Sequence, residues 1–338
     1  TILFGFLACL TLATHLFLVE IVLTHKHGSR LTGFAKKELG PLAHWVSAWT
    51  YPLQLVGANL AYLILGGEFL ALIASWFGVA IPVLAWQIAF CVLGGITVFY
   101  GLRMIAKVET YAAWLLILSI LVAGVLSTYL AHPLIGSQFF HTWHFSWLPF
   151  GVFLFALSGL PAIGTAVDMV EYRPRDAYRA VAIGTIGAAV LSWIFGVSLV
   201  IASTNPHLIE PLDLMDSLPV GLGWLIPLIG FLAVATSYVT TTQDLRMTLH
   251  IDFRVGKRLA WATAIGLPLI ILLTTSRHFL SVVGAVGAIF GAINGILVAL
   301  IFIKIFERHK RHEPLYMFVL PVLVILAYLT GLFQKLLG

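Results

Sequence analysis

Residues 147–174 read WLPFGVFLFALSGLPAIGTAVDMVEYRP. This stretch is apolar and long enough to cross a bilayer, yet Ser158-Gly159-Leu160-Pro161 interrupts it near its middle. Pro161 has no N–H and its ring crowds the carbonyl of Leu157, and Gly159 lets the backbone leave the helical conformation at little cost. The pattern predicts either an ordinary proline kink or two half-helices separated by a break at bilayer depth.

The composition of the whole chain is that of a helical membrane protein. Hydrophobic residues make up 60% of the sequence and charged residues 10%, and the mean hydropathy is +1.02, whereas a soluble domain carries about 25% charged residues. The expected partner is therefore the lipid bilayer, and the formal net charge of +5 does not indicate nucleic-acid binding. Cys9 and Cys91 lie in apolar stretches and are interpreted as small buried hydrophobes. No cofactor or metal site is expected.

The distribution of apolar runs and charges predicts the topology. All but two of the 19 Lys and Arg residues lie in the connections that follow odd-numbered apolar runs, the exceptions being Arg277 and Lys335. By the positive-inside rule these connections are cytoplasmic, which predicts a multi-pass protein of the plasma (inner) membrane. The fold class is all-α, with ten transmembrane helices expected at residues 1–24, 41–77, 83–104, 110–131, 147–171, 177–203, 221–243, 256–275, 279–306 and 315–335.

This orientation has a consequence at the N-terminus. If the connection at 25–40 is cytoplasmic, Thr1 lies outside and the first span runs inward. We therefore expect at least one earlier helix before Thr1, which would bring the full protein to eleven spans with a cytoplasmic N-terminus.

Ionisable residues inside spans are costly and mark functional candidates. Glu68 has no basic residue near it in sequence and is a candidate for a proton-binding carboxylate. Asp168, near the inner end of the interrupted span, is interpreted as pairing with Arg173 or Arg175 in an interfacial ion network. His15, a lone histidine in an apolar span, is interpreted as a hydrogen-bonded core residue.

Hydroxyl side chains gather in the inner half of the seventh span, where residues 235–244 read ATSYVTTTQD. At helical spacing Thr236, Thr240 and Asp244 share one face, and Ser237 and Thr241 lie beside them. Together with carbonyls of an unwound neighbouring helix, these hydroxyls would form an oxygen cage for a small cation. A polar seam between two helices is the alternative.

Two further spans carry unusual residues. In 41–77, Asn59 and Tyr62 place polar groups near mid-membrane. In 279–306, Gly284, Gly287 and Gly291 lie on one small-residue face, which is typical of a helix that packs tightly against a neighbour.

Three of these segments together resemble an amino acid permease: the interrupted Phe155-Ala156-Leu157-Ser158-Gly159, the run AYLILGGEF at 61–69, and Thr236-Ser237-Tyr238. The chain is most similar to the bacterial aromatic (tryptophan and tyrosine) amino acid permeases and to related neutral amino acid transporters. These belong to the amino acid, polyamine and organocation superfamily, which has the leucine-transporter fold.

The resemblance implies a single transmembrane transporter domain over residues 1–338 that is built from two inverted five-helix repeats. Residues 1–131 would be the remainder of the first repeat, 147–306 the second repeat with its discontinuous helix at 147–171, and 315–335 an additional C-terminal helix. The helix expected before Thr1 would be the first, also discontinuous, helix of the family.

The resemblance also implies a site at the break. The carbonyls at the end of the first half-helix would accept hydrogen bonds from a substrate ammonium group, and hydroxyls of the seventh span would hold a coupling ion, H⁺ or Na⁺. The expected substrate-binding residues are Phe155, Ala156, Leu157, Ser158, Gly159, Tyr62 and Asn59, and the expected coupling residues are Thr236, Ser237 and Glu68.

The function expected from these features is secondary active import of an aromatic or neutral amino acid by cation-coupled alternating access. An amino acid sensor without net transport is one alternative. An intramembrane enzyme is a weaker one, because the sequence has no HExxH, GxSxG or CxxC motif. The oligomeric state is left open.

Overall fold

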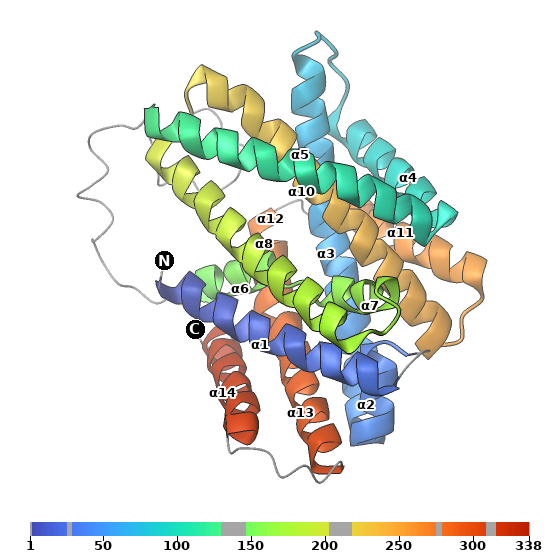
Figure 1. Ribbon diagram of the computed structural model, residues 1–338. Helices are drawn as coiled ribbons and strands as arrows, with labels where there is room; N and C mark the ends of the chain where they lie inside the picture. The colour runs from blue at the N-terminus through green and yellow to red at the C-terminus, as the bar shows by residue number, and fades with distance from the viewer. Residues whose placement is uncertain are drawn as a thin grey trace.

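The computed structural model describes residues 2–25, 29–129, 147–202, 218–274, 279–308 and 316–337. Within these ranges the chain folds into helices joined by short connections (Figure 1). The helices, in chain order, are α1 (Ile2–His25), α2 (Leu31–Leu39), α3 (Pro41–Ser75), α4 (Val83–Tyr100), α5 (Leu102–Tyr129), α6 (Trp147–Leu157), α7 (Leu160–Met169), α8 (Pro174–Ala202), α10 (Val220–Met247), α11 (Lys257–Thr274), α12 (Phe279–Ala285), α13 (Ala292–Arg308) and α14 (Tyr316–Leu337). Two π-helical segments, η2 (Thr248–Asp252) and η3 (Val286–Gly291), continue α10 and α12.

The helices agree closely with the predicted spans. Among the described residues, 9 helical segments are long and apolar enough to cross a membrane, and Val319–Phe333 within α14 is a shorter apolar segment at the position of the tenth predicted span. The main difference lies between the third and fourth spans. There α4 ends before Gly101, whose φ of +86° suits glycine, and α5 begins at once at Leu102, where the sequence predicted a loop over 105–109.

The interrupted stretch forms two separate helices. α6 ends at Leu157 and α7 begins at Leu160, with Ser158 and Gly159 outside both. Pro161 sits in the first turn of α7, where its missing N–H costs no hydrogen bond. The structure therefore confirms the discontinuous helix and excludes a simple kink.

Close helix packing holds α6 in place against the continuous α12–η3–α13 element. A Cβ added to Gly287 would lie 2.0 Å from the carbonyl oxygen of Gly151 on α6, and one added to Gly151 would lie 2.3 Å from the carbonyl oxygen of Gly284. The backbones of the two elements thus touch, as the small-residue face in this span predicted.

The main buried cluster of hydrophobic side chains joins α1, the two half-helices and α13. α1 packs against α6, α7, α8 and α13, and α3 packs against α4 and α10. By contrast α5 and α8, which contact each other, expose much of their apolar surface, including Trp114 and Leu118 on α5 and Ile183 on α8. These apolar faces suit contact with lipid.

Candidate functional site

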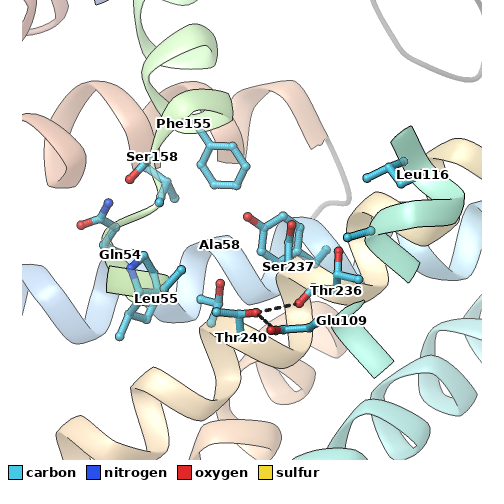
Figure 2. Close-up of a pocket in the computed structure, with 17 residues that line it drawn as sticks. Gln54, Leu55, Ala58, Glu109, Leu116, Phe155, Ser158, Thr236, Ser237 and Thr240 are labelled. Carbon is cyan, nitrogen blue, oxygen red and sulfur yellow. Dashed lines mark hydrogen bonds between the residues drawn. The ribbon is translucent and has the colours of Figure 1, made fainter. Parts of the chain in front are cut away.

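A cavity of about 250 Å³ opens beside the break between α6 and α7 (Figure 2). Six helical elements contribute to its wall: α3, α5, α10, η3 and the two half-helices α6 and α7, which meet at the break. Drug-sized ligands occupy pockets of about 300–1,000 Å³, so this cavity matches a smaller metabolite. The lining residues are Gln54, Leu55, Ala58, Tyr62, Glu109, Ala113, Leu116, Phe155, Ser158, Gly159, Pro161, Ala162, Thr236, Ser237, Thr240, Thr241 and Val286.

The break forms one side of this cavity and is itself held by a histidine. The backbone N–H of Gly159 donates to His15 Nε2 at 3.0 Å, and His15 Nδ1 lies 2.8 Å from the hydroxyl of Thr185 on α8. Because Nε2 accepts, the proton of the neutral ring is on Nδ1 and faces Thr185. His15 is 2% exposed, and its interpretation as a hydrogen-bonded core residue is confirmed.

Aromatic side chains form the apolar part of the wall. Phe155, at the end of α6, and Tyr62, on α3, both line the cavity, and their ring centroids are 5.7 Å apart. The Tyr62 hydroxyl interacts with the hydroxyls of Ser237 and Thr241 on α10. Tyr62 therefore belongs to the apolar wall through its ring and to the polar wall through its hydroxyl.

The polar wall lies on α10 and α5. The cavity is lined by hydroxyl side chains from two successive turns of α10, namely Thr236 and Ser237, then Thr240 and Thr241. Thr240 is hydrogen-bonded to Glu109 of α5. The Thr236 hydroxyl is directed at its own helix, with the carbonyls of Leu232 and Ala233 both 3.1 Å away. Such back-bonding is common for threonine in helices and leaves less of its hydroxyl for a ligand.

The structure brings together six of the residues proposed from the sequence: Phe155, Ser158, Gly159, Tyr62, Thr236 and Ser237. Leu157 is buried in the hydrophobic core and the side chain of Ala156 is exposed, so neither side chain lines the cavity. Their predicted role concerned the main-chain carbonyls. The carbonyl of Phe155 already accepts the N–H of Ser158 at 3.1 Å.

Two predicted residues lie away from the cavity. Asn59 is fully buried in α3 and is not among the lining residues, and its amide atoms have no hydrogen-bond partner among the described residues. Glu68 is partly buried near the end of α3 and does not line the cavity either. Their roles in substrate and ion binding stay predictions.

Glu109 is the functional candidate that the sequence analysis missed. The fourth span was expected to begin at residue 110, which left Glu109 in a loop, whereas α5 begins at Leu102 and carries Glu109 on its second turn. A signal was available, since residues 102–129 contain no proline and their only glycine is Gly124. A helix continuing through residues 102–110 would have placed this carboxylate in the membrane.

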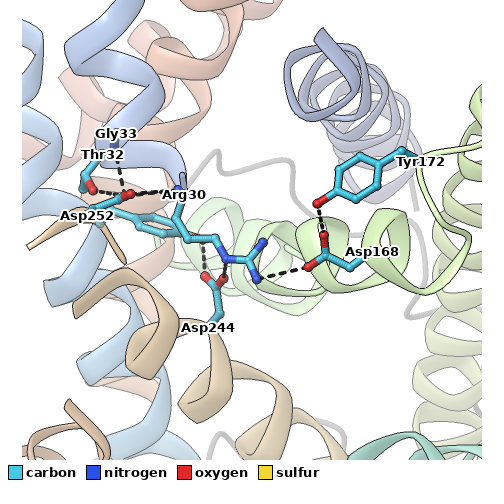
Figure 3. A network of polar contacts seen from close by, with 8 residues as sticks. Arg30, Thr32, Gly33, Asp168, Tyr172, Asp244 and Asp252 are labelled. Carbon is cyan, nitrogen blue, oxygen red and sulfur yellow. Dashed lines mark hydrogen bonds and ion pairs between the residues drawn. The ribbon is translucent and has the colours of Figure 1, made fainter. Parts of the chain in front are cut away.

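A second polar cluster lies near one end of α7 and α10 and is centred on Arg30 (Figure 3). Arg30 Nε lies 3.3 Å from Asp244 Oδ1 on α10, and Arg30 Nη2 lies 3.5 Å from Asp168 Oδ2 on α7. Tyr51 of α3 donates to Asp244, and Tyr172 donates to Asp168. We call these five residues the Arg30 cluster.

The Arg30 cluster corrects the sequence interpretation of Asp168. Its ion-pair partner is Arg30, more than a hundred residues earlier, while Arg173 pairs with Asp176 at 3.1 Å. Burial alone would lower the pKa of the Arg30 guanidinium, but Asp244 and then Asp168 outweigh burial and raise that pKa above its ordinary value. Arg30 is therefore a fixed positive charge.

Asp252, at the end of η2, secures the segment that carries Arg30. Its carboxylate accepts the backbone N–H of Arg30 at 3.0 Å and of Gly33 at 2.9 Å, together with the hydroxyl of Thr32. These donors form the N-terminus of α2, where a negative charge is favoured. The connection between α1 and α2 is thereby tied to the end of α10.

Comparison with family models gave no match for this chain. Among curated proteins, it is similar to the putrescine transporter PotE of Haemophilus influenzae, with 25% identity over 251 residues, 70% of this chain and 52% of PotE. The matched region thus spans about half the length of that relative.

Among solved structures, the chain is similar to MhsT, whose crystal structure is in complex with L-phenylalanine. The TM-score is 0.67 at 16% sequence identity, and the match covers 98% of this chain and 90% of the MhsT chain. At this identity the likeness shows the fold. The chain is therefore an all-α, multi-pass protein of the plasma membrane with the leucine-transporter-like fold that its sequence predicts.

Proposed function

We propose that this protein is a secondary active transporter of an amino acid, belonging to the amino acid, polyamine and organocation superfamily and working by alternating access. The observation that carries this proposal is the cavity of about 250 Å³ beside the break between α6 and α7. Non-helical backbone at membrane depth is tolerated where it lines a cavity, and such broken helices hold the substrates of secondary transporters. The similarity to PotE and to MhsT supports the same class.

The helix dipoles at the break suit a zwitterion. The C-terminal end of α6 carries partial negative charge and the N-terminal end of α7 carries partial positive charge, and both meet at Ser158 and Gly159. An α-amino acid bears an ammonium and a carboxylate group on neighbouring carbons. Its two charges therefore match the two helix ends that meet beside the cavity.

The rest of the cavity favours an aromatic or neutral amino acid. Phe155 and Tyr62 offer aromatic surface, and the wall carries no basic side chain among its lining residues. L-Phenylalanine in the MhsT structure and putrescine in the name of PotE share a primary ammonium group. A substrate with an ammonium group and an apolar side chain fits the aromatic surface, the lack of a basic lining side chain and the ammonium group that the two ligands share.

The coupling ion is proposed to be H⁺ or Na⁺. Thr236 and Ser237 face the cavity, as the oxygen-cage hypothesis requires, although the Thr236 hydroxyl also bonds to its own helix. The roles of Glu68 and Asn59 stay predictions.

Substrate counterflow tests this function. The full-length protein is reconstituted in proteoliposomes preloaded with unlabelled tryptophan, tyrosine, phenylalanine, leucine or putrescine, and uptake of the same labelled compound is followed. We expect counterflow for at least one amino acid with an apolar side chain. Saturable binding without counterflow would favour the sensor alternative, and conversion of the substrate would favour the enzyme.

A glycine variant tests the placement of the site. A Cβ at Gly159 would lie 3.0 Å from the His15 ring, which accepts the Gly159 N–H, so a leucine here would displace the backbone of the break that lines the cavity. We expect Gly159→Leu to abolish counterflow while the protein remains folded in detergent. Gly184→Leu on α8, where a Cβ meets nothing within 4 Å, is the matched control and should transport normally. Wild-type counterflow by Gly159→Leu would refute this placement of the site.

A further inference from the structure

Glu109 and Thr240 form a hydrogen-bonded pair between α5 and α10 in the wall of the cavity (Figure 2). We propose that Glu109 is the site that takes up and releases the coupling proton. The Thr240 hydroxyl is its hydrogen-bond partner in both protonation states. This inference rests on the transporter function proposed above and replaces the open choice of ion with a proton at a named carboxylate.

The hydrogen bonds of Thr240 point to two protonation states. The Thr240 hydroxyl lies within hydrogen-bond distance of two acceptors, the carboxylate of Glu109 and the carbonyl of Thr236, the latter at 3.0 Å. A hydroxyl has only one proton to donate but can also accept. If Glu109 is ionised, Thr240 donates to the carboxylate. If Glu109 is protonated, the carboxyl O–H donates to Thr240, and Thr240 donates to the carbonyl of Thr236.

Both protonation states of Glu109 are therefore satisfied by a rotation of one hydroxyl, without movement of a helix. A buried polar group that loses its hydrogen bond carries a large penalty, and this arrangement avoids that penalty in either state. Thr240 is a positioning residue in this scheme, and the proton itself resides on Glu109.

The charges around Glu109 favour a proton as its neutralising partner. The other cavity-lining residues carry no formal charge, and none of the ion pairs among the described residues involves Glu109. On its own helix, Lys107 is exposed. On α10, Arg246 is directed to the carbonyl of Val98 at 2.7 Å and to Gln243.

The other helices packed against α5 supply no charge to this carboxylate. α4 contains no charged residue, and on α8 the charged residues lie in the first turns, with Asp176 paired to Arg173. A carboxylate at the membrane without a countercharge is costly. Its protonation removes that cost and leaves the cavity neutral.

The proton transfer is balanced by water. On the side from which substrate enters, hydronium gives its proton to the Glu109 carboxylate and leaves as water. On the opposite side, the Glu109 carboxyl returns the proton to water. Alternating access of the cavity, as proposed above, would connect Glu109 to each side in turn.

The test separates exchange from proton-driven accumulation. The full-length wild type, Glu109→Gln and Glu307→Gln are reconstituted in proteoliposomes. Glu307, half-exposed and paired with Lys304 at 3.2 Å away from the cavity, is the matched control. Counterflow of the amino acid that passes the first test is measured without gradients, and accumulation is then measured under an imposed pH gradient, with a pH dye inside the vesicles.

We expect Glu109→Gln to keep counterflow but to lose both accumulation and substrate-induced acidification of the vesicle lumen, while Glu307→Gln keeps all three. Glutamine can donate to Thr240 as the protonated acid does, but it cannot release a proton. We also expect Thr240→Val to reduce accumulation and Thr240→Ser to restore it, because serine supplies the same rotating hydroxyl.

Three results would overturn the inference and leave the transporter function intact. Proton-driven accumulation by Glu109→Gln would place the proton elsewhere, and loss of its counterflow would make Glu109 a substrate-binding residue. Accumulation by the wild type under a sodium gradient but not under a pH gradient would show that the coupling ion is Na⁺ and not a proton. Absence of counterflow in the wild type would instead refute the transporter function itself, and the inference with it.

Discussion

His15 shows how a single side chain can stabilise a broken helix in a membrane. Gly159 lies between two helices, so its N–H has no partner within either of them. In lipid no water is available to bond such a group. The ring of His15 accepts this N–H and is itself oriented by Thr185, so that one residue of α1 and one of α8 secure the break.

Removal of this acceptor should destabilise the protein. We expect His15→Ala to lower the free energy of unfolding by about 1–3 kcal/mol, because the Gly159 N–H is left without a partner. Thr185→Ala, which removes only the contact that orients the ring, should have a smaller effect. Thermal unfolding of the purified variants in detergent measures both. Equal stability of His15→Ala and the wild type would contradict this role.

At the scale of elements, the contact between α6 and the α12–η3–α13 element sets the position of the first half-helix. Gly151 faces Gly284 and Gly287 with no side chain between the backbones. The π-helical turn η3 lies at this contact and also supplies Val286 to the cavity wall. A shift of η3 would therefore move both α6 and the wall of the site.

Gly287 is the most sensitive position of this contact. We expect Gly287→Ala to reduce stability by about 1–3 kcal/mol or to prevent folding, because overpacking forces the backbone of α6 outward. Gly187→Ala on α8, where a Cβ meets nothing within 4 Å, should be neutral or slightly stabilising. The yield of monodisperse protein and the unfolding temperature in detergent distinguish the two. A fully stable Gly287→Ala would show that α6 can move away from η3 by the width of a methyl group at no cost in stability.

At the scale of the whole molecule, the Arg30 cluster connects parts of the chain that are far apart in sequence. It links the segment before α2 to α3, α7 and α10, and Asp252 ties the same segment to η2 (Figure 3). Gly164 on α7 makes room for it, because a Cβ there would lie 2.1 Å from Arg30 Nη1. The Arg30 cluster thus holds the C-terminal end of α7 through Asp168, and His15 holds the break before its N-terminal end.

Loss of the Arg30 charge should weaken the whole fold. The side chains of Arg30 and Asp244 are 9% and 2% exposed, and breaking a buried ion pair from one side costs about 3–5 kcal/mol. We expect Arg30→Gln to unfold at clearly lower temperature, and Arg173→Gln, which removes an exposed pair, to behave like the wild type. The double variant Arg30→Gln/Asp244→Asn should recover part of the loss. No recovery would show that the two charges act independently.

Local patterns were sufficient to predict most elements and part of the site. Apolar length identified the spans, and Gly159 with Pro161 located the break, because these residues act on the backbone within one turn. The hydroxyl pattern of α10 predicted Thr236 and Ser237 as coupling residues. Both line the cavity, and their role in ion binding stays a prediction. Glu109 was missed because the span was bounded by its apolar run, whereas the helix also includes the polar residues that precede that run.

The sequence by itself determined the class of the protein, its helices and the interruption at Ser158-Gly159, since apolar runs and backbone breakers act locally. Only the tertiary structure decided which residues share the cavity, that His15 accepts the Gly159 N–H, and that Arg30 is the partner of Asp168 and Asp244. The physical reason is that a hydrogen bond or ion pair depends on distance in space. Residues 15 and 159, 109 and 240, or 30 and 244 meet only after the helices have packed.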